Sequence, residues 1–131
     1  RPPPMSAPSD PAAVVDAFLA AMEAKDYAAA APFVAEDCHY ENMYAPGVVH
    51  TGPAGVVGFL EPFFAPISKN EFHVLRRAVA GDVVFIERLD RHLFGAKWVE
   101  LPVTGVFEDK DGKIVFYRDY FDAQVLTAQL A

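Results

Sequence analysis

A chain of 131 residues is long enough for one domain, and its hydrophobic fraction of 53% is ample for a sizeable core. The formal net charge of −7, with lysines and arginines scattered singly, leaves no basic stripe for a phosphate backbone, so no nucleic-acid partner is expected. No apolar run approaches the roughly 20 residues of a membrane span, so no membrane partner is expected either.

The cysteine content and the start of the chain bear on location. Cys38 is the only cysteine, so neither an intrachain disulfide nor a cysteine-based zinc cluster can form, and we expect a buried, inert thiol. The start lacks the charged-then-apolar layout of a signal peptide, which favours a cytoplasmic protein. Residues 1–4 precede Met5, and we expect residues 1–8 to be a disordered tail or a cloning remnant and residues 9–131 to form a single domain.

The first half of the chain predicts three helices. Ser9-Asp10-Pro11 combines an N-cap with proline at the first helical position, and apolar residues follow at helical spacing over residues 14–22. A second, Ala-rich helix is expected from Asp26 through Ala35, shortened or kinked by Pro32. A third starts at Gly52-Pro53 and runs to about residue 64, after a short extended segment at 38–42 and a turn at 45–47.

The second half predicts a sheet. Three long strands are expected at residues 71–79, 83–94 and 97–107, with a further strand at 113–121 and a short closing tail at 124–130. Helices followed by such strands predict an α+β fold, in which a curved, mixed but mostly antiparallel sheet packs against the N-terminal helices. Sheet and helices together are expected to enclose a deep, cone-shaped pocket.

Charged residues occupy positions in these strands where apolar residues are usual. Side chains alternate between the two faces of a strand, so Arg88 and Asp90 share one side of the strand at 83–94. The opposite side is equally mixed, and the pattern therefore does not tell which side is buried. In the last strand, Asp119 shares a face with apolar and aromatic residues such as Tyr117, so we expect it to face inward.

An isolated buried carboxylate is costly, so Asp119 needs a cationic partner. Face parity turns Arg118 away and leaves Arg88. If Asp119, Arg88 and Asp90 meet, two carboxylates share one guanidinium, and low dielectric keeps a proton on one of them near neutral pH. Such a site would hold a proton donor and a proton acceptor. A purely structural ion pair of Arg88 with Asp90 stays open as the alternative.

Three separated motifs resemble those of the limonene-1,2-epoxide hydrolase family: Tyr40-Glu41-Asn42-Met43, Glu87-Arg88-Leu89-Asp90 and Arg118-Asp119-Tyr120-Phe121-Asp122. The resemblance covers nearly the whole chain from the first helix onward. It implies the cone-shaped α+β fold shared with nuclear transport factor two, ketosteroid isomerase and scytalone dehydratase. It also implies an active site deep in the cone and a homodimer.

The same resemblance implies a role for each site residue. Asp119 would be the general base that takes a proton from water, and Tyr40 and Asn42 would hold that water. Asp90 would be the general acid that protonates the epoxide oxygen, with Arg88 bridging the two carboxylates. The implied partners are water and a small hydrophobic epoxide, cyclic or terpene-like, which becomes a vicinal diol. The resemblance implies no metal, no cofactor and no covalent ester.

The remaining candidates are the histidines, as metal ligands, and several apolar residues, as walls of the pocket. The four histidines are spread out along the chain, so we expect no metal site. His92 shares the face of Arg88 and Asp90 and is a candidate to line the pocket. Further candidates for an apolar wall are Met43, Tyr44, Leu60, Phe64, Phe94 and Trp98. Tyr44-Ala45-Pro46-Gly47 departs from the proline-rich loop of the limonene enzyme, so the identity of the epoxide stays open.

Two other functions stay open at this point. A ketosteroid-isomerase-like or polyketide-cyclase-like enzyme would use one Asp to move a proton next to a carbonyl. An arginine that bridges two acids argues against that chemistry. A non-catalytic module would store a hydrophobic ligand in the same cone, although three charged groups are a costly lining for an apolar guest.

Overall fold

The computed structural model describes residues 10–131, and the tail expected at residues 1–8 lies outside this range. The helices are α1 (Pro11–Glu23), α2 (Tyr27–Ala30), a short 3-10 helix η1 (Ala31–Phe33), α3 (Gly52–Phe64) and α4 (Ala123–Leu130). The strands are β1 (Val34–Asn42), β2 (Val49–Thr51), β3 (Ile67–Ala80), β4 (Val83–Phe94), β5 (Lys97–Lys110) and β6 (Lys113–Tyr120). Among these helices, none combines the length and apolar character of a membrane span.

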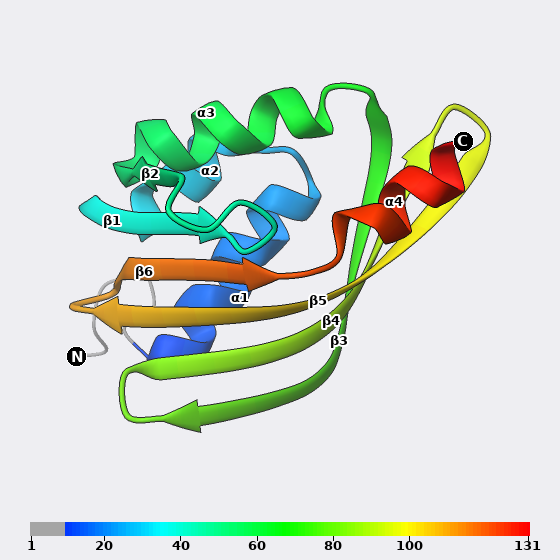
Figure 1. The fold of residues 1–131 in the computed structure, drawn as a ribbon. Helices are drawn as coiled ribbons and strands as arrows, with labels where there is room; N and C mark the ends of the chain where they lie inside the picture. The colour runs from blue at the N-terminus through cyan, green and yellow to red at the C-terminus, as the bar shows by residue number, and fades with distance from the viewer. Residues whose placement is uncertain (1–9) are drawn as a thin grey trace, which may run out of the picture.

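The six strands form one sheet in the order β2-β1-β6-β5-β4-β3. All neighbouring strands are antiparallel except β1 and β6, which run parallel. Figure 1 shows β3, β4 and β5 as long, strongly curved strands. Helix α1 packs across β3, β4, β5 and β6, and α3 packs against β1. The α+β fold with a mixed, mostly antiparallel sheet is therefore confirmed.

The first and third helices form as their sequences predict. The Asp10 side chain accepts a hydrogen bond of 3.1 Å from the Ala13 backbone N–H and caps α1. The predicted apolar face of α1 is buried: Val14, Val15, Phe18, Leu19 and Met22. At the other end of α1, the Glu23 carboxylate accepts a hydrogen bond of 2.6 Å from the Phe72 backbone N–H, which joins the helix to β3.

The expected helix from Asp26 through Ala35 is too long. Helix α2 ends at Ala30, one turn of 3-10 helix follows, and β1 already begins at Val34. Pro32 has no backbone N–H for an α-helical ladder, whereas Val34 pairs with Ile114 of β6. The segment expected as a short closing tail at 124–130 forms a helix, α4. The Asp122 side chain accepts a hydrogen bond from Gln124 N and caps this helix. Strand β3 begins at Ile67 and β5 ends at Lys110, so both are longer than predicted.

The structure shows which side of β4 is buried. Every second residue from Val84 to His92 is buried and faces the helices, whereas Phe85 on the other side is exposed. Arg88 and Asp90 thus point into the interior. Cys38 is also fully buried, and burial raises the pKa of its thiol to about 12, as an inert thiol requires.

Candidate active site

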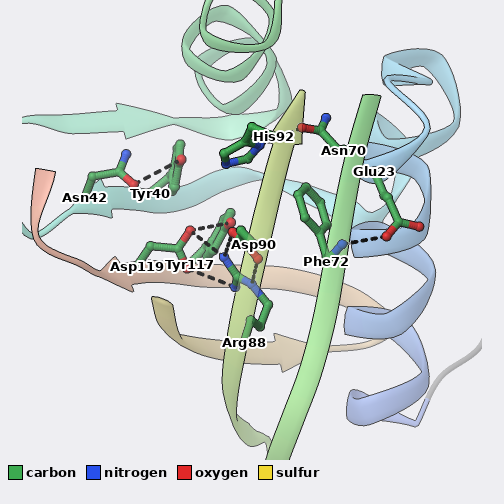
Figure 2. A network of polar contacts seen from close by, with 10 residues as sticks. All are labelled: Glu23, Tyr40, Asn42, Asn70, Phe72, Arg88, Asp90, His92, Tyr117 and Asp119. Carbon is green, nitrogen blue, oxygen red and sulfur yellow. Dashed lines mark hydrogen bonds and ion pairs between the residues drawn. The ribbon is translucent and has the colours of Figure 1, made fainter. Parts of the chain in front are cut away.

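Arg88 lies between two buried carboxylates and bonds to both (Figure 2). Its Nε and Nη2 donate to Asp90 Oδ1 and Oδ2, each at 3.0 Å. Its Nη1 and Nη2 donate to Asp119 Oδ1 and Oδ2, at 3.2 and 3.4 Å. Arg88 is only 3% exposed, and both aspartates are 6% exposed. The expected meeting of these three side chains is confirmed.

Burial and charge act in opposite directions on this cluster. Burial raises the pKa of Asp119, and the charge and hydrogen bonds of Arg88 oppose that rise. Burial lowers the pKa of Arg88, but the nearby charges of Asp119 and Asp90 have the larger effect. Together they hold the pKa of Arg88 well above its ordinary value. The guanidinium therefore stays charged, and a second full negative charge beside it is unfavourable. One proton shared between the two carboxyls makes the cluster neutral.

Tyr117 is a site residue that the sequence analysis placed only as an aromatic neighbour. Its hydroxyl donates a hydrogen bond of 2.9 Å to Asp119 Oδ2. Its ring is stacked on Tyr40 on one side and Phe107 on the other, with centroids 4.5 and 4.4 Å apart. Burial raises the pKa of Tyr117 well above its ordinary value, so the hydroxyl remains a neutral donor. Its position two residues before Asp119 on the same face was the available signal.

Tyr40 and Asn42 reach the same cluster through the parallel pairing of β1 with β6. In this register Tyr40 lies beside Tyr117, and Asn42 lies beside Asp119. The Tyr40 hydroxyl donates to Asn42 Oδ1 at 3.4 Å. The Asn42 Nδ2 atom is buried and has no hydrogen-bond partner within residues 10–131. Asn42 thus keeps a donor available for a small polar molecule.

Gly105 of β5 makes room for the ion pair. It lies opposite Asp119 on β6 and opposite Ile86 on β4. A Cβ at this position would be 2.8 Å from Arg88 Nη1 and 2.8 Å from Asp119 Oδ1, closer than real contacts allow. A larger residue at this position would therefore displace the end of the Arg88 or the Asp119 side chain. Strand periodicity and motif spacing do not predict this role for Gly105.

These polar groups line a cavity of about 270 Å³. Its apolar walls come from α1, α3, β3, β5 and the closing helix α4, and include Leu19, Met22, Phe59, Leu60, Phe63, Phe64, Phe72, Leu101, Val103 and Leu126. Of the predicted wall residues, Tyr44, Leu60, Phe64 and His92 line the cavity. Met43, Phe94 and Trp98 do not. Trp98 instead packs under the Arg91 guanidinium, at 4.3 Å, and Phe94 packs against the core at the end of β4.

A second polar network lies beside the site on β1 and β6. The Glu41 carboxylate accepts from Arg118 Nη2 at 2.7 Å, from His39 Nε2 at 2.9 Å and from the Gly47 backbone N–H at 2.9 Å. The Gly47 bond, followed by the His39 and Arg118 bonds, lowers the pKa of Glu41 to about 2. Arg118 points to Glu41 and away from Asp119, as its strand position predicted. Within residues 10–131, no group of three or more His, Cys, Asp or Glu side chains could hold a metal ion.

Comparison with known proteins gives the relatives of this chain. A family model described as the limonene-1,2-epoxide hydrolase catalytic domain matches residues 9–131. The epoxide hydrolase EphG of Mycobacterium tuberculosis (strain ATCC 25618 / H37Rv) is 31% identical over an alignment 116 residues long, which covers 82% of this chain and 70% of EphG. A solved LEH-like epoxide hydrolase of M. tuberculosis superimposes with a TM-score of 0.75 at 30% identity, over 89% of this chain and 86% of that chain.

More distant solved structures share the architecture alone. A SnoaL-like polyketide cyclase fold from Shewanella denitrificans OS-217 superimposes with a TM-score of 0.81 at 12% identity, over 92% of this chain and 96% of that chain. A hypothetical protein with a ketosteroid isomerase-like fold from Catenulispora acidiphila DSM 44928 gives 0.78 at 23% identity, over 88% and 90%. These similarities confirm the cone-shaped fold, but they do not indicate which reaction the protein catalyses.

Proposed function

The chain belongs to the limonene-1,2-epoxide hydrolase family, and from this membership we propose that it adds water to a small hydrophobic epoxide and releases a vicinal diol. The observation that carries the proposal is the guanidinium of Arg88 held between two buried carboxylates at the wall of an apolar cavity. An alkoxide is a poor leaving group and neutral water is a weak nucleophile, so ring opening needs a proton donor and a proton acceptor together.

We assign the proton acceptor to Asp119. Three donors converge on its carboxylate, two from Arg88 and one from Tyr117, and they favour its ionised form. Burial raises its pKa, which makes the ionised carboxylate a stronger base than an exposed aspartate. In this assignment the Asn42 Nδ2 donor and the Tyr40 hydroxyl hold the water whose proton Asp119 takes.

We assign the proton donor to Asp90 in its carboxylic acid form. As the water oxygen bonds to an epoxide carbon, the C–O bond breaks and its electron pair stays on the epoxide oxygen, which takes the Asp90 proton. Asp119 then carries the proton from water, and its return to Asp90 restores the starting state. General acid and general base catalysis each contribute on the order of 10²–10⁴-fold.

The cavity supports a compact, cyclic or terpene-like substrate. Its volume of about 270 Å³ is slightly smaller than that of common ligand pockets, which measure about 300–1,000 Å³. Its walls are mainly leucine, valine, methionine and phenylalanine side chains. A compact hydrocarbon skeleton suits this space better than a bulky steroid.

The test is diol formation from limonene oxide and cyclohexene oxide in the presence of a chelator. We expect the parent to form diol, and Asp119→Asn and Asp90→Asn each to lose at least about 100-fold in kcat. Asp16→Asn is the matched control, because Asp16 forms an exposed ion pair with Arg77 on another part of the fold. A single turnover in ¹⁸O-water should place the label in the diol and none in the protein. A folded parent that opens neither epoxide but isomerises a Δ5-ketosteroid would support the isomerase chemistry instead.

We also propose that the protein forms a homodimer through β3. Within residues 10–131, β3 is the longer of the two end strands of the sheet, so one of its backbone edges is unpaired. Exposed apolar side chains lie on β3 and its neighbour: Val74, Leu75, Val79 and Phe85. Exposed apolar side chains along an unpaired edge favour association with a second copy. Sedimentation velocity should give a dimer for the parent and a monomer for Leu75→Glu, and a monomeric parent would refute the proposal.

A further inference from the structure

His92 is a polar residue of the cavity wall that takes no part in the ion pairs of Arg88. It lies two residues beyond Asp90 on the inward face of β4, lines the cavity and is 2% exposed. Figure 2 shows it next to Asn70 on the side of Phe72 and away from Asp119. The proton transfers assigned above do not use this side chain.

The contact with Asn70 determines which ring nitrogen faces the cavity as an acceptor. His92 Nδ1 lies 2.7 Å from Asn70 Oδ1, and a carbonyl oxygen only accepts, so Nδ1 carries the hydrogen. Burial lowers the pKa of His92, and the ring is neutral at pH 7. Nε2 therefore holds an unshared electron pair. No hydrogen bond to Nε2 occurs among the residues that the structure describes.

The surroundings of the ring are apolar. Phe63, Phe64 and Phe72 pack around it, with ring centroids 5.6, 6.2 and 6.5 Å from that of His92. Nε2 is not fully enclosed by protein, so it opens onto the cavity, and an acceptor left without a donor when an apolar ligand fills this space is unfavourable. A ligand that brings an O–H group into the cavity removes the cost. The imidazole is thus built to distinguish a ligand with a hydroxyl from one without.

We propose that Nε2 of His92 accepts a hydrogen bond from a hydroxyl of the substrate, so that the preferred substrates are epoxides with a hydroxyl on the far side of an apolar skeleton. This inference rests on the proposed epoxide hydrolysis at the Arg88 site. Residues two apart on a strand are separated by roughly 7 Å, so the hydroxyl lies several bonds from the epoxide ring that Asp90 protonates.

Two matched epoxides test the inference. The 1,2-epoxides of α-terpineol and of p-menth-1-ene have the same skeleton and differ in one hydroxyl across the ring. We expect the parent to favour the hydroxylated epoxide by about ten- to hundredfold in kcat/KM. His92→Phe should bring this ratio close to one, and His92→Gln, which keeps an acceptor, should restore part of it. His73→Phe is the same change at an exposed histidine bonded to Glu71, and it should keep the parental ratio.

A binding experiment separates this inference from the proposed function. The alkenes α-terpineol and p-menth-1-ene cannot undergo ring opening, and calorimetry should show tighter binding of the alcohol to the parent but not to His92→Phe. If that preference is seen while neither epoxide is opened, the proposed hydrolysis fails and the hydroxyl site stands. If the parent opens both epoxides with equal efficiency and binds both alkenes equally, the hydroxyl site is overturned and the hydrolysis stands.

Discussion

Glu41 and Arg118 lie directly beside each other on the parallel strands β1 and β6, and their side chains form an ion pair of 2.7 Å. Glu41 sits between Tyr40 and Asn42, and Arg118 immediately precedes Asp119. Because side chains alternate along a strand, a pair on one face fixes the register of the neighbours on the other. The ion pair therefore aligns Asn42 with Asp119 across the two strands.

Replacing Glu41 by glutamine should loosen this alignment. The amide keeps the size of the side chain but loses the charge that Arg118, His39 and the Gly47 N–H bind. We expect kcat for diol formation to fall roughly tenfold, because small misplacements of reacting groups are costly. Glu87→Gln is the control, since it breaks an exposed pair with Arg76. Equal rates for the two variants would contradict the positioning role.

The same variant has a defined pH signature. The pKa of Glu41 is about 2, below its ordinary value of 4.5, so the carboxylate stabilises the fold fully above pH 4.5. That stabilisation is lost as the pH falls toward 2. The denaturant midpoints of the parent and Glu41→Gln should therefore differ at pH 6 and converge as the pH approaches 2.

Tyr117→Phe should shift the pH dependence of the reaction. The variant keeps the stacked ring but removes the 2.9 Å hydrogen bond to Asp119 Oδ2, which opposes the rise of the Asp119 pKa. The Asp119 pKa should rise further, so the acidic limb of the kcat profile should move to higher pH. We expect a roughly tenfold lower kcat at pH 7. Tyr27→Phe on α2, away from the cavity, should leave the profile unchanged.

Gly105→Ala should push the Arg88 and Asp119 side chains apart. The added methyl group would lie 2.8 Å from Arg88 Nη1 and from Asp119 Oδ1, so one side chain has to move. We expect a loss of about 1–3 kcal/mol in the free energy of unfolding and near-complete loss of diol formation. Gly58→Ala is the matched control. It lies in α3 with nothing within 4 Å of the added atom, and it should stabilise the protein by roughly 0.5–1 kcal/mol.

Asp109 on β5 should make the protein less stable as the pH rises. Both carboxylate oxygens are buried and lack hydrogen-bond partners within residues 10–131. Burial, with the charges of Asp82 and Asp10, raises the pKa of Asp109 from 3.8 to about 7. The folded state therefore binds more protons than the unfolded state between these values, and stability falls across this window and is level above it.

Asp109→Asn is the test of this expectation. At about 1.4 kcal/mol per pKa unit, the destabilisation amounts to as much as about 4 kcal/mol above pH 7. The variant should thus be more stable than the parent at pH 8, and the difference should shrink toward pH 4. Asp37→Asn, an exposed position on β1, controls for the change in net charge. A variant that is less stable at pH 8 would show that the ionised Asp109 is favourably bound.

The sequence predicts which side chains share one face of a strand, but it does not predict which face is buried. Two-residue periodicity places Arg88 and Asp90 on one side of β4, and the structure agrees. Both sides of that strand carry charges, so the choice between them depends on where the helices pack. That packing is a tertiary interaction, because α1 crosses four different strands. The same limit applies to Val34, whose strand conformation depends on its pairing with Ile114.

The role of Gly105 could not be predicted for a related reason, and the one signal for Tyr117 is its place on the same strand face as Asp119. The requirement for glycine at 105 arises from two side chains on different strands, Arg88 on β4 and Asp119 on β6, which reach over it. No local pattern in the sequence records that crossing. The polar role of the Tyr117 hydroxyl does not follow from the residue type, since an aromatic residue on an inward strand face most often belongs to the core.

The parallel pairing of β1 with β6 has a consequence for synthesis of the protein. Glu41 and Arg118 are 77 residues apart, and strands β2, β3, β4 and β5 lie between them in the chain. While the ribosome is still translating β5, β1 has only β2 beside it and Asp119 does not yet exist. The water-holding residues and the residue assigned as base come together only when β6 leaves the exit tunnel and inserts between β1 and β5. Activity should therefore appear abruptly when β6 inserts, with no partly active nascent chain before that insertion.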